Sequence, residues 1–146
     1  MVRIEVERRI DAPRERVWAR YTDHVSWSEW AKMGKVRLER EGAPTRDGSG
    51  CVRVISNGGV SVVEEVLDFE APARMTYRVV RGGIPIKEHL GEVMMEERGD
   101  GTQVVWCCRF RSRIPGLGWF WKLLVSRLFA GALAGLDKDL STQRAA

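Results

Sequence analysis

The chain has 146 residues, of which 44% are hydrophobic and 30% are charged, and its formal net charge is +4. This length fits a single domain, residues 1–146, with one hydrophobic core, and this composition excludes a mostly disordered chain. Basic residues alternate with Asp and Glu along the chain and do not gather with aromatic residues, so we expect no nucleic-acid binding.

The N-terminal segment predicts one strand followed by two short helices. In residues 2–10, apolar side chains alternate with charged ones, which is the period-two pattern of a half-buried strand. Asp11 can cap a helix that begins near Pro13 and ends near Asp23. Residues 26–31 predict the second short helix.

Residues 35–112 predict a succession of strands. Turn residues separate runs in which apolar and polar side chains alternate, and they occur at Asn57–Gly59, Ala71–Pro72, Gly82–Gly83 and Asp100–Gly101. Sequential hairpins give an antiparallel sheet, which has about six to seven strands when the first strand is included.

Residues 115–142 predict one long helix of about seven turns. Apolar side chains surround most of its circumference, so the helix needs cover, and we expect a sheet that curls around it. Lys122 and Arg127 lie in the middle of this segment, which disfavours a membrane span. The charged alternation of residues 1–10 differs from a secretory signal, so we expect a cytoplasmic protein without an integral membrane segment.

The three cysteines, Cys51, Cys107 and Cys108, argue against a disulfide framework, because their number is odd and two are adjacent. No C-x-x-C pair or histidine cluster accompanies them, so the spacing also fails as a zinc site. We expect reduced thiols buried in strands, and neither a metal nor a cofactor.

Four segments carry a resemblance that covers almost the whole chain: Ile10–Pro13 followed by Val17 and Trp18, His24–Trp30, Glu64–Asp68 running into Ala71–Arg78, and Gly101–Trp106. In this order and spacing they resemble the helix-grip (SRPBCC) superfamily, which includes START lipid-transfer domains, pollen-allergen-type proteins and the polyketide cyclase/dehydrase family. The resemblance implies an α+β helix-grip fold, in which a curved antiparallel sheet wraps around a long C-terminal helix with a deep pocket between them. It implies no single activity, because the superfamily includes carriers, cyclases, hydrolases and regulatory modules.

Strand alternation and helix periodicity predict which side chains face this pocket. Arg109 and Arg111 mark one face of their strand as exposed to solvent, so the other face of that strand points inward. Trp27 and Trp30 are expected at the mouth. The predicted ligand-binding set is Trp18, Trp27, Trp30, Arg53, Met75, Val93, Met95, Trp106, Cys108, Phe110, Phe120, Leu124, Arg127 and Leu128.

His89 and Tyr77 are the first candidates for chemistry. The strand phase places His89 inside, where it could orient a ligand carbonyl, act as an acid or base, or be a hydrogen-bonded interior histidine. Tyr77 could fix a polar ligand atom, or it could be a core tyrosine whose hydroxyl bonds to the backbone. His24, in the turn after the first helix, is expected at the surface or as a capping residue.

Glu64 is the third candidate. Glu64 and Glu65 are adjacent in a strand, so one of them points inward, although alternation alone does not decide which. A buried carboxylate is a site candidate. Arg53 is a possible partner across the Asn57–Gly59 hairpin, and a cross-strand pair on the surface is the other interpretation.

Three functions are compatible with these residues. The first is a carrier or sensor that binds a hydrophobic or aromatic small molecule, such as a lipid or a polyketide-like compound. The second is a cyclase/dehydrase-type enzyme without metal or cofactor, in which His89, Tyr77 and the inward glutamate transfer protons. The third is a partner-binding module that uses the apolar C-terminal helix against another subunit or a membrane surface. The protein is expected to be a monomer or a homodimer.

Overall fold

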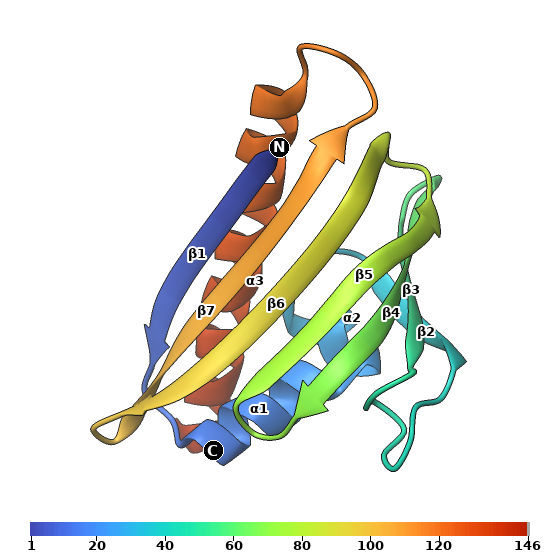
Figure 1. The fold of residues 1–146 in the computed structure, drawn as a ribbon. Coiled ribbons are helices and arrows are strands. Elements are labelled where there is room, and N and C mark those ends of the chain that lie inside the picture. The colour runs from blue at the N-terminus through green and yellow to red at the C-terminus, as the bar shows by residue number, and fades with distance from the viewer. Residues whose placement is uncertain (146) are drawn as a thin grey trace.

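A computed structural model describes the backbone of residues 1–145 and the side chains of residues 1–142. The elements follow the expected order of a strand, short helices, six further strands and a long helix (Figure 1). They are β1 (Val2–Ile10), α1 (Arg14–Thr22), the 3-10 helix η1 (His24–Ser26), α2 (Trp27–Trp30), β2 (Lys35–Arg40), β3 (Val52–Asn57), β4 (Val60–Glu70), β5 (Arg74–Gly82), β6 (Ile86–Arg98), β7 (Gly101–Ser112) and α3 (Gly118–Ala145).

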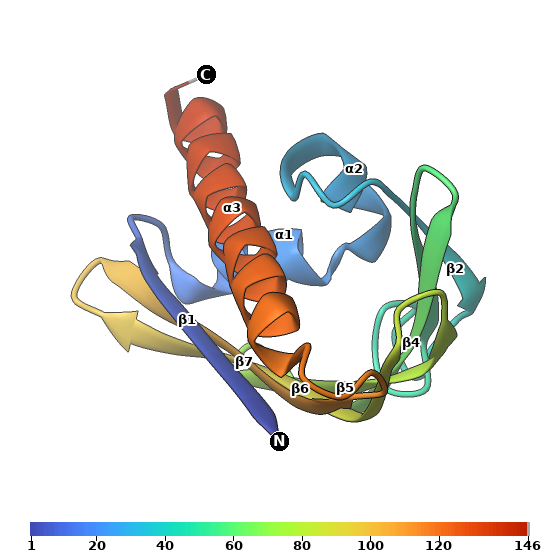
Figure 2. The same ribbon diagram turned by 90° about the horizontal axis from the view of Figure 1, so that it is seen from above.

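The described strands form one seven-stranded antiparallel sheet in the order β1-β7-β6-β5-β4-β3-β2. Each strand from β2 to β7 pairs with its neighbour in sequence, as consecutive hairpins require, and β1 closes the other edge beside β7. Figure 2 shows the sheet curving below α3, with α1 and α2 beside that helix. This arrangement confirms the α+β helix-grip fold.

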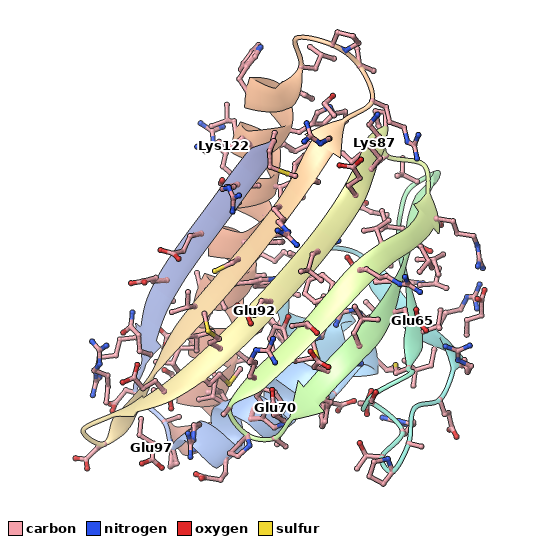
Figure 3. The ribbon with its side chains drawn as sticks, viewed as in Figure 1. Glu65, Glu70, Lys87, Glu92, Glu97 and Lys122 are labelled. Atoms are coloured by element: carbon pink, nitrogen blue, oxygen red, sulfur yellow. The ribbon has the colours of Figure 1, made fainter. Side chains whose placement is uncertain are left out.

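The concave face of the sheet carries the core, and the period-two prediction is confirmed on β7. Val104, Trp106, Cys108 and Phe110 are all buried, whereas Arg109 between them is exposed. The convex face carries charged side chains that pair across strands, including Glu65 with Arg78 and Glu92 with Arg74 (Figure 3). The sheet is therefore apolar on the side of α3 and charged on the other side.

The α3 helix is covered over only half of its length, and here the expectation of cover around most of the circumference is wrong. Leu133, Leu136 and Leu140 in its C-terminal half are buried. In its N-terminal half, Trp119 is 68% exposed and Leu123 is 47% exposed. The reason is that α1 and α2 pack only beside the C-terminal half, where Gly135 lets the Trp30 carbonyl approach closely.

By length and composition alone, residues Gly118–Thr142 of α3 could cross a membrane, with 28% of the most apolar window buried. Core helices of soluble proteins meet the same criterion.

Two boundaries also differ from expectation. Pro13, and not Asp11, is the N-cap of α1, and α3 begins at Gly118, after a turn at Pro115 and Gly116.

Candidate functional site

A cavity of about 380 Å³ lies between the concave face of the sheet and the exposed N-terminal half of α3. Strands β3 to β7 and the loop before β6 provide one wall, and α3 provides the other. Most of its lining is apolar, and its polar members are Asn57, Glu64, His89 and Cys108. The apolar lining consists of Met33, Ile55, Val60, Val62, Val79, Ile84, Ile86, Phe110, Leu124, Val125, Leu128 and Phe129.

A second hollow of about 390 Å³ lies on the charged convex face, where its lining includes Arg3, Arg74 and Arg109. Its walls come from one face of the sheet, so it is a groove in a solvated surface. The inner cavity has walls from two layers and is the better enclosure for an apolar molecule.

Glu64 is the glutamate that points inward. The β3–β4 register pairs Arg53 with Glu64, and Arg53 Nε donates to Glu64 Oε1 at 2.9 Å. Arg53 is fully buried, and the Glu64 side chain is 11% exposed. Glu65 lies on the convex face with Arg40 and Arg78. The pair predicted across the hairpin is therefore real, but it is internal, and the surface interpretation is wrong.

Two aromatic rings lie against the Arg53 guanidinium. Its Cζ lies 4.5 Å from the centroid of the Trp27 ring and 4.6 Å from that of Tyr77. Both rings attract the cation through their π faces. Arg53 Nη2 lies 2.8 Å from Glu64 Oε1 as an ion pair, but neither Nη1 nor Nη2 forms a hydrogen bond with any described residue. The guanidinium is thus held by one carboxylate and two rings.

Tyr77 lies behind the cavity wall and does not line it. Trp106 Nε1 donates to the Tyr77 hydroxyl at 2.6 Å, so its partner is a side chain and not the expected backbone. The ring lies flat over Gly91 of β6, where an added Cβ would be 2.2 Å from Tyr77 Cζ. Burial raises the pKa of Tyr77 well above its ordinary value. The phenol is therefore neutral, and its hydroxyl already has a partner.

His89 lines the cavity in a defined tautomer. The backbone N–H of Val79 donates to His89 Nδ1 at 3.1 Å. Burial lowers the pKa of His89, so the ring is neutral near pH 7. Since Nδ1 accepts, the proton of the neutral ring is on Nε2. One ring nitrogen is thus hydrogen-bonded inside the sheet, as predicted for an interior histidine, whereas a role toward a ligand or a proton stays a prediction.

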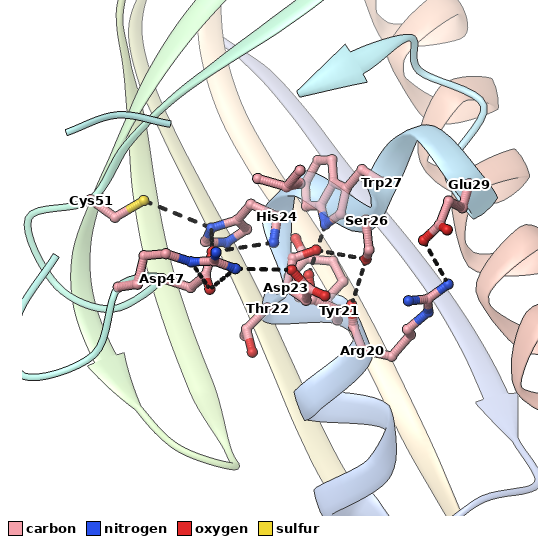
Figure 4. A network of polar contacts seen from close by, with 12 residues as sticks. Arg20, Tyr21, Thr22, Asp23, His24, Ser26, Trp27, Glu29, Asp47 and Cys51 are labelled. Atoms are coloured by element: carbon pink, nitrogen blue, oxygen red, sulfur yellow. Dashed lines mark hydrogen bonds and ion pairs between the residues drawn. The ribbon is translucent and has the colours of Figure 1, made fainter. Parts of the chain in front are cut away.

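His24 is fully buried, and the expectation of a surface or capping residue is wrong. Its Nδ1 lies 3.2 Å from Asp47 Oδ1, and Cys51 Sγ lies 3.8 Å from the same nitrogen (Figure 4). Burial, assisted by the charge of Arg53, lowers the pKa of His24 to about 4. Its Nε2 has no hydrogen-bond partner among the described residues. The physical reason for its position is that η1 turns this side chain into the core, against the segment before β3.

The predicted ligand-binding residues separate into three groups. Those that line the cavity are Cys108, Phe110, Leu124 and Leu128, together with Glu64 and His89 from the chemical candidates. Phe120 and Arg127 lie on exposed parts of α3 outside the lining. Buried residues that lie behind the lining are Trp18, Trp27, Trp30, Arg53, Met75, Val93, Met95 and Trp106.

The expectation that Trp27 and Trp30 lie at the mouth is wrong. Both are almost fully buried, and both indole nitrogens are used internally. Trp27 Nε1 donates to the backbone oxygen of Tyr21 at 2.7 Å, and Trp30 Nε1 donates to Ser26 Oγ at 3.1 Å. These hydrogen bonds fix the two indoles beneath α3, on the core side of the cavity.

Most of the lining from the β3–β4 hairpin and half of the lining from α3 were not predicted from the sequence. Two of these residues could have been predicted from strand alternation. Ile55 lies two positions after Arg53, and Val62 lies two positions before Glu64, so each lies on the same inward face as that residue. Val125 and Phe129 directly follow the predicted Leu124 and Leu128, and all four line the cavity, so the lining face of α3 is wider than predicted. All three cysteines are free, and Cys107 is only half buried.

Residues 1–141 match the model of a family described as polyketide cyclase / dehydrase and lipid transport. Among solved structures, a protein from Thermus thermophilus is 25% identical, with 97% of this chain and 98% of that chain covered and a TM-score of 0.72. A START superfamily protein from Mycobacterium smegmatis is 12% identical, with 98% and 97% covered and a TM-score of 0.74.

DynU16, a protein of the dynemicin biosynthetic locus, is 17% identical with a TM-score of 0.74. The alignment covers 98% of this chain but only 48% of DynU16, so the chain spans about half the length of that protein. Among curated proteins, none matches the chain.

Proposed function

The chain belongs to the polyketide cyclase/dehydrase and lipid transport family, and on this basis we propose that it binds a hydrophobic or aromatic small molecule as a carrier or sensor. The observation that carries the proposal is the cavity of about 380 Å³ with a mainly apolar lining. Small-molecule sites are typically concave and largely apolar, with a few polar groups that orient the ligand. Glu64 and His89 are the orienting groups here.

The position of Tyr77 behind the cavity wall removes one of the three candidates for proton transfer and favours binding over catalysis. The Tyr77 hydroxyl accepts from Trp106, Glu64 is paired with Arg53, and His89 Nδ1 accepts from Val79. A proton-transfer catalyst needs a group that can exchange a proton with the substrate. Of these groups, only His89 and Glu64 also line the cavity.

Two observations keep the other candidates in view. His89 and Glu64 line one cavity, which supports a cyclase/dehydrase-type proton transfer without Tyr77. Trp119 and Phe120 are exposed at the start of α3, which supports contact with a partner or a membrane surface. Both features are compatible with a bound ligand, so binding is the function that we propose first.

The test is a fluorescence titration with Nile red, an uncharged hydrophobic dye. We expect saturable binding of one dye per chain with a blue shift of its emission. Leu124→Trp places a larger side chain in the lining and should weaken binding about tenfold or more. Leu123→Trp is the matched control, because Leu123 is similarly exposed on α3 but lies outside the lining, and its affinity should stay at the wild-type value. Equal weakening by both substitutions, or no saturable binding to the wild type, would contradict the proposal.

A further inference from the structure

The polar groups of the cavity specify the ligand more narrowly. Building on the proposed function, we propose that the ligand is a hydrophobic molecule with a free hydroxyl group, an alcohol or a phenol. In the complex this hydroxyl donates to Glu64 Oε2 and accepts from His89 Nε2.

Glu64 supplies a fixed acceptor. Both contacts with Arg53 fall on Oε1, and within residues 1–142 no side chain or backbone group donates to Oε2. Oε2 is also not fully enclosed by protein, and Glu64 lines the cavity. A carboxylate that is paired with a guanidinium accepts hydrogen bonds and cannot donate one. The cavity therefore presents one strong acceptor.

His89 supplies the matching donor. Its Nδ1 is held by the Val79 N–H, which leaves the proton on Nε2. Nε2 is likewise not enclosed by protein, and the ring lines the same cavity. The β4–β5 register places Glu64 directly opposite Val79, the residue whose N–H holds the His89 ring. The donor and the acceptor are thus neighbours on one wall.

A hydroxyl is the group that satisfies both at once, because it has one proton to donate and lone pairs to accept. An ether or a ketone can only accept hydrogen bonds, so its entry would remove water from Glu64 Oε2 without giving that oxygen a hydrogen-bond donor. A carboxylate ligand would bring a second negative charge next to Glu64. A hydrocarbon would desolvate both polar groups and satisfy neither. The rest of the lining, including Phe110, Phe129 and Leu128, requires an apolar body behind the hydroxyl.

The experiment compares four probes by isothermal titration calorimetry at pH 7: 2-naphthol, 2-methoxynaphthalene, naphthalene and 2-naphthoate. We expect 2-naphthol to bind at least about tenfold more tightly than each of the others, since a site built for a hydroxyl discriminates against analogues that lack it. Equal affinities for 2-naphthol and its methyl ether would overturn the inference and leave the proposed function intact. Absence of binding by all four probes, together with the absence of Nile red binding, would overturn both.

Glu64→Gln tests the acceptor directly. The carbonyl of the new side-chain amide can still accept from Arg53, which turns the amide N–H donors toward the cavity. The preference for 2-naphthol over 2-methoxynaphthalene should fall to less than about threefold. Glu65→Gln is the matched control, because Glu65 lies on the convex face, and it should retain the wild-type preference. Retention of the full preference in Glu64→Gln would contradict the inference.

His89→Asn tests the donor without disturbing the pair of Arg53 and Glu64. The side-chain oxygen of the introduced asparagine can accept from Val79 in place of Nδ1, while the Nε2 donor is lost. The affinity for 2-naphthol should fall at least about fivefold, with the melting temperature close to that of the wild type. An unchanged affinity in a folded His89→Asn protein would contradict the assigned role of His89.

Discussion

Arg53 and Glu64 face each other across the β3–β4 hairpin, with Arg53 Nε 2.9 Å from Glu64 Oε1, and both point into the protein. The arginine is fully buried against two aromatic rings, and the glutamate lines the cavity. Arg53 therefore holds the Glu64 carboxylate in place through Oε1, and Oε2 remains available to a molecule in the cavity.

Removal of one partner should be far more costly than removal of both. Arg53→Met leaves the Glu64 carboxylate without its counter-ion, and we expect a loss of about 3–5 kcal/mol in the free energy of unfolding. The double variant with Glu64→Leu removes the unpaired charge and should recover most of that loss. Urea unfolding of the two single variants and the double variant measures the coupling. A double variant destabilised by the sum of the single effects would show that the ion pair is not coupled.

Two tyrosine hydroxyls offer a second matched comparison. Tyr77→Phe leaves the buried Trp106 Nε1–H without an acceptor, so we expect a loss of about 1–3 kcal/mol. The Tyr21 hydroxyl is equally buried, and although it lies near the Arg53 guanidinium, no described residue forms a hydrogen bond of ordinary geometry with it. Tyr21→Phe should therefore change the free energy of unfolding by less than about 0.5 kcal/mol, or raise it. Equal effects in thermal or urea unfolding would contradict this assignment of partners.

The sheet and its inward face could be predicted from the sequence because strand alternation is a local property. Arg109 is exposed, and this fixes the phase of all of β7, including Trp106 and Cys108. Glu64 and Glu65 show the limit of that logic. Alternation places them on opposite faces, but only the register with Arg53 shows which of them points inward.

The remaining errors involve residues whose position depends on distant segments. Trp27 and Trp30 pack into the core because α3 returns over them more than a hundred residues later in the chain. The burial of His24 depends on Asp47 and Cys51, which a long loop brings next to η1. No local pattern contains these contacts, so Trp27 and Trp30 were expected at the mouth of the pocket that the resemblance implied, and His24 was expected in a surface turn.

The buried His24 should make stability depend on pH. Its pKa in the folded protein is about 4, below the ordinary value of 6.5, so the unfolded chain binds the proton first as the pH falls. The stabilisation is fully present above about pH 6.5 and is lost as the pH falls toward about 4, with a total loss of about 3 kcal/mol. His24→Asn can keep a donor to Asp47 but does not titrate, so its unfolding free energy should fall less over this range.

Urea unfolding of both proteins at pH 7 and pH 4 measures the difference. His89 titrates in both proteins, so the difference between the two curves reports His24 together with Asp47, whose pKa is raised by burial but lowered overall by the hydrogen bond and the charge of His24. An identical loss of stability in the wild type and in His24→Asn would contradict a buried, neutral His24.

The central claim is that a hydrophobic small molecule occupies the cavity between the sheet and α3. The most direct measurement is a titration of ¹⁵N-labelled protein with 2-naphthol, followed by two-dimensional NMR of the backbone amides. We expect the largest shift changes at the cavity residues Val62, Val79 and His89, with little change at Arg3 and Arg74 in the convex groove. Shift changes confined to the convex face, or no saturable changes at all, would contradict the claim.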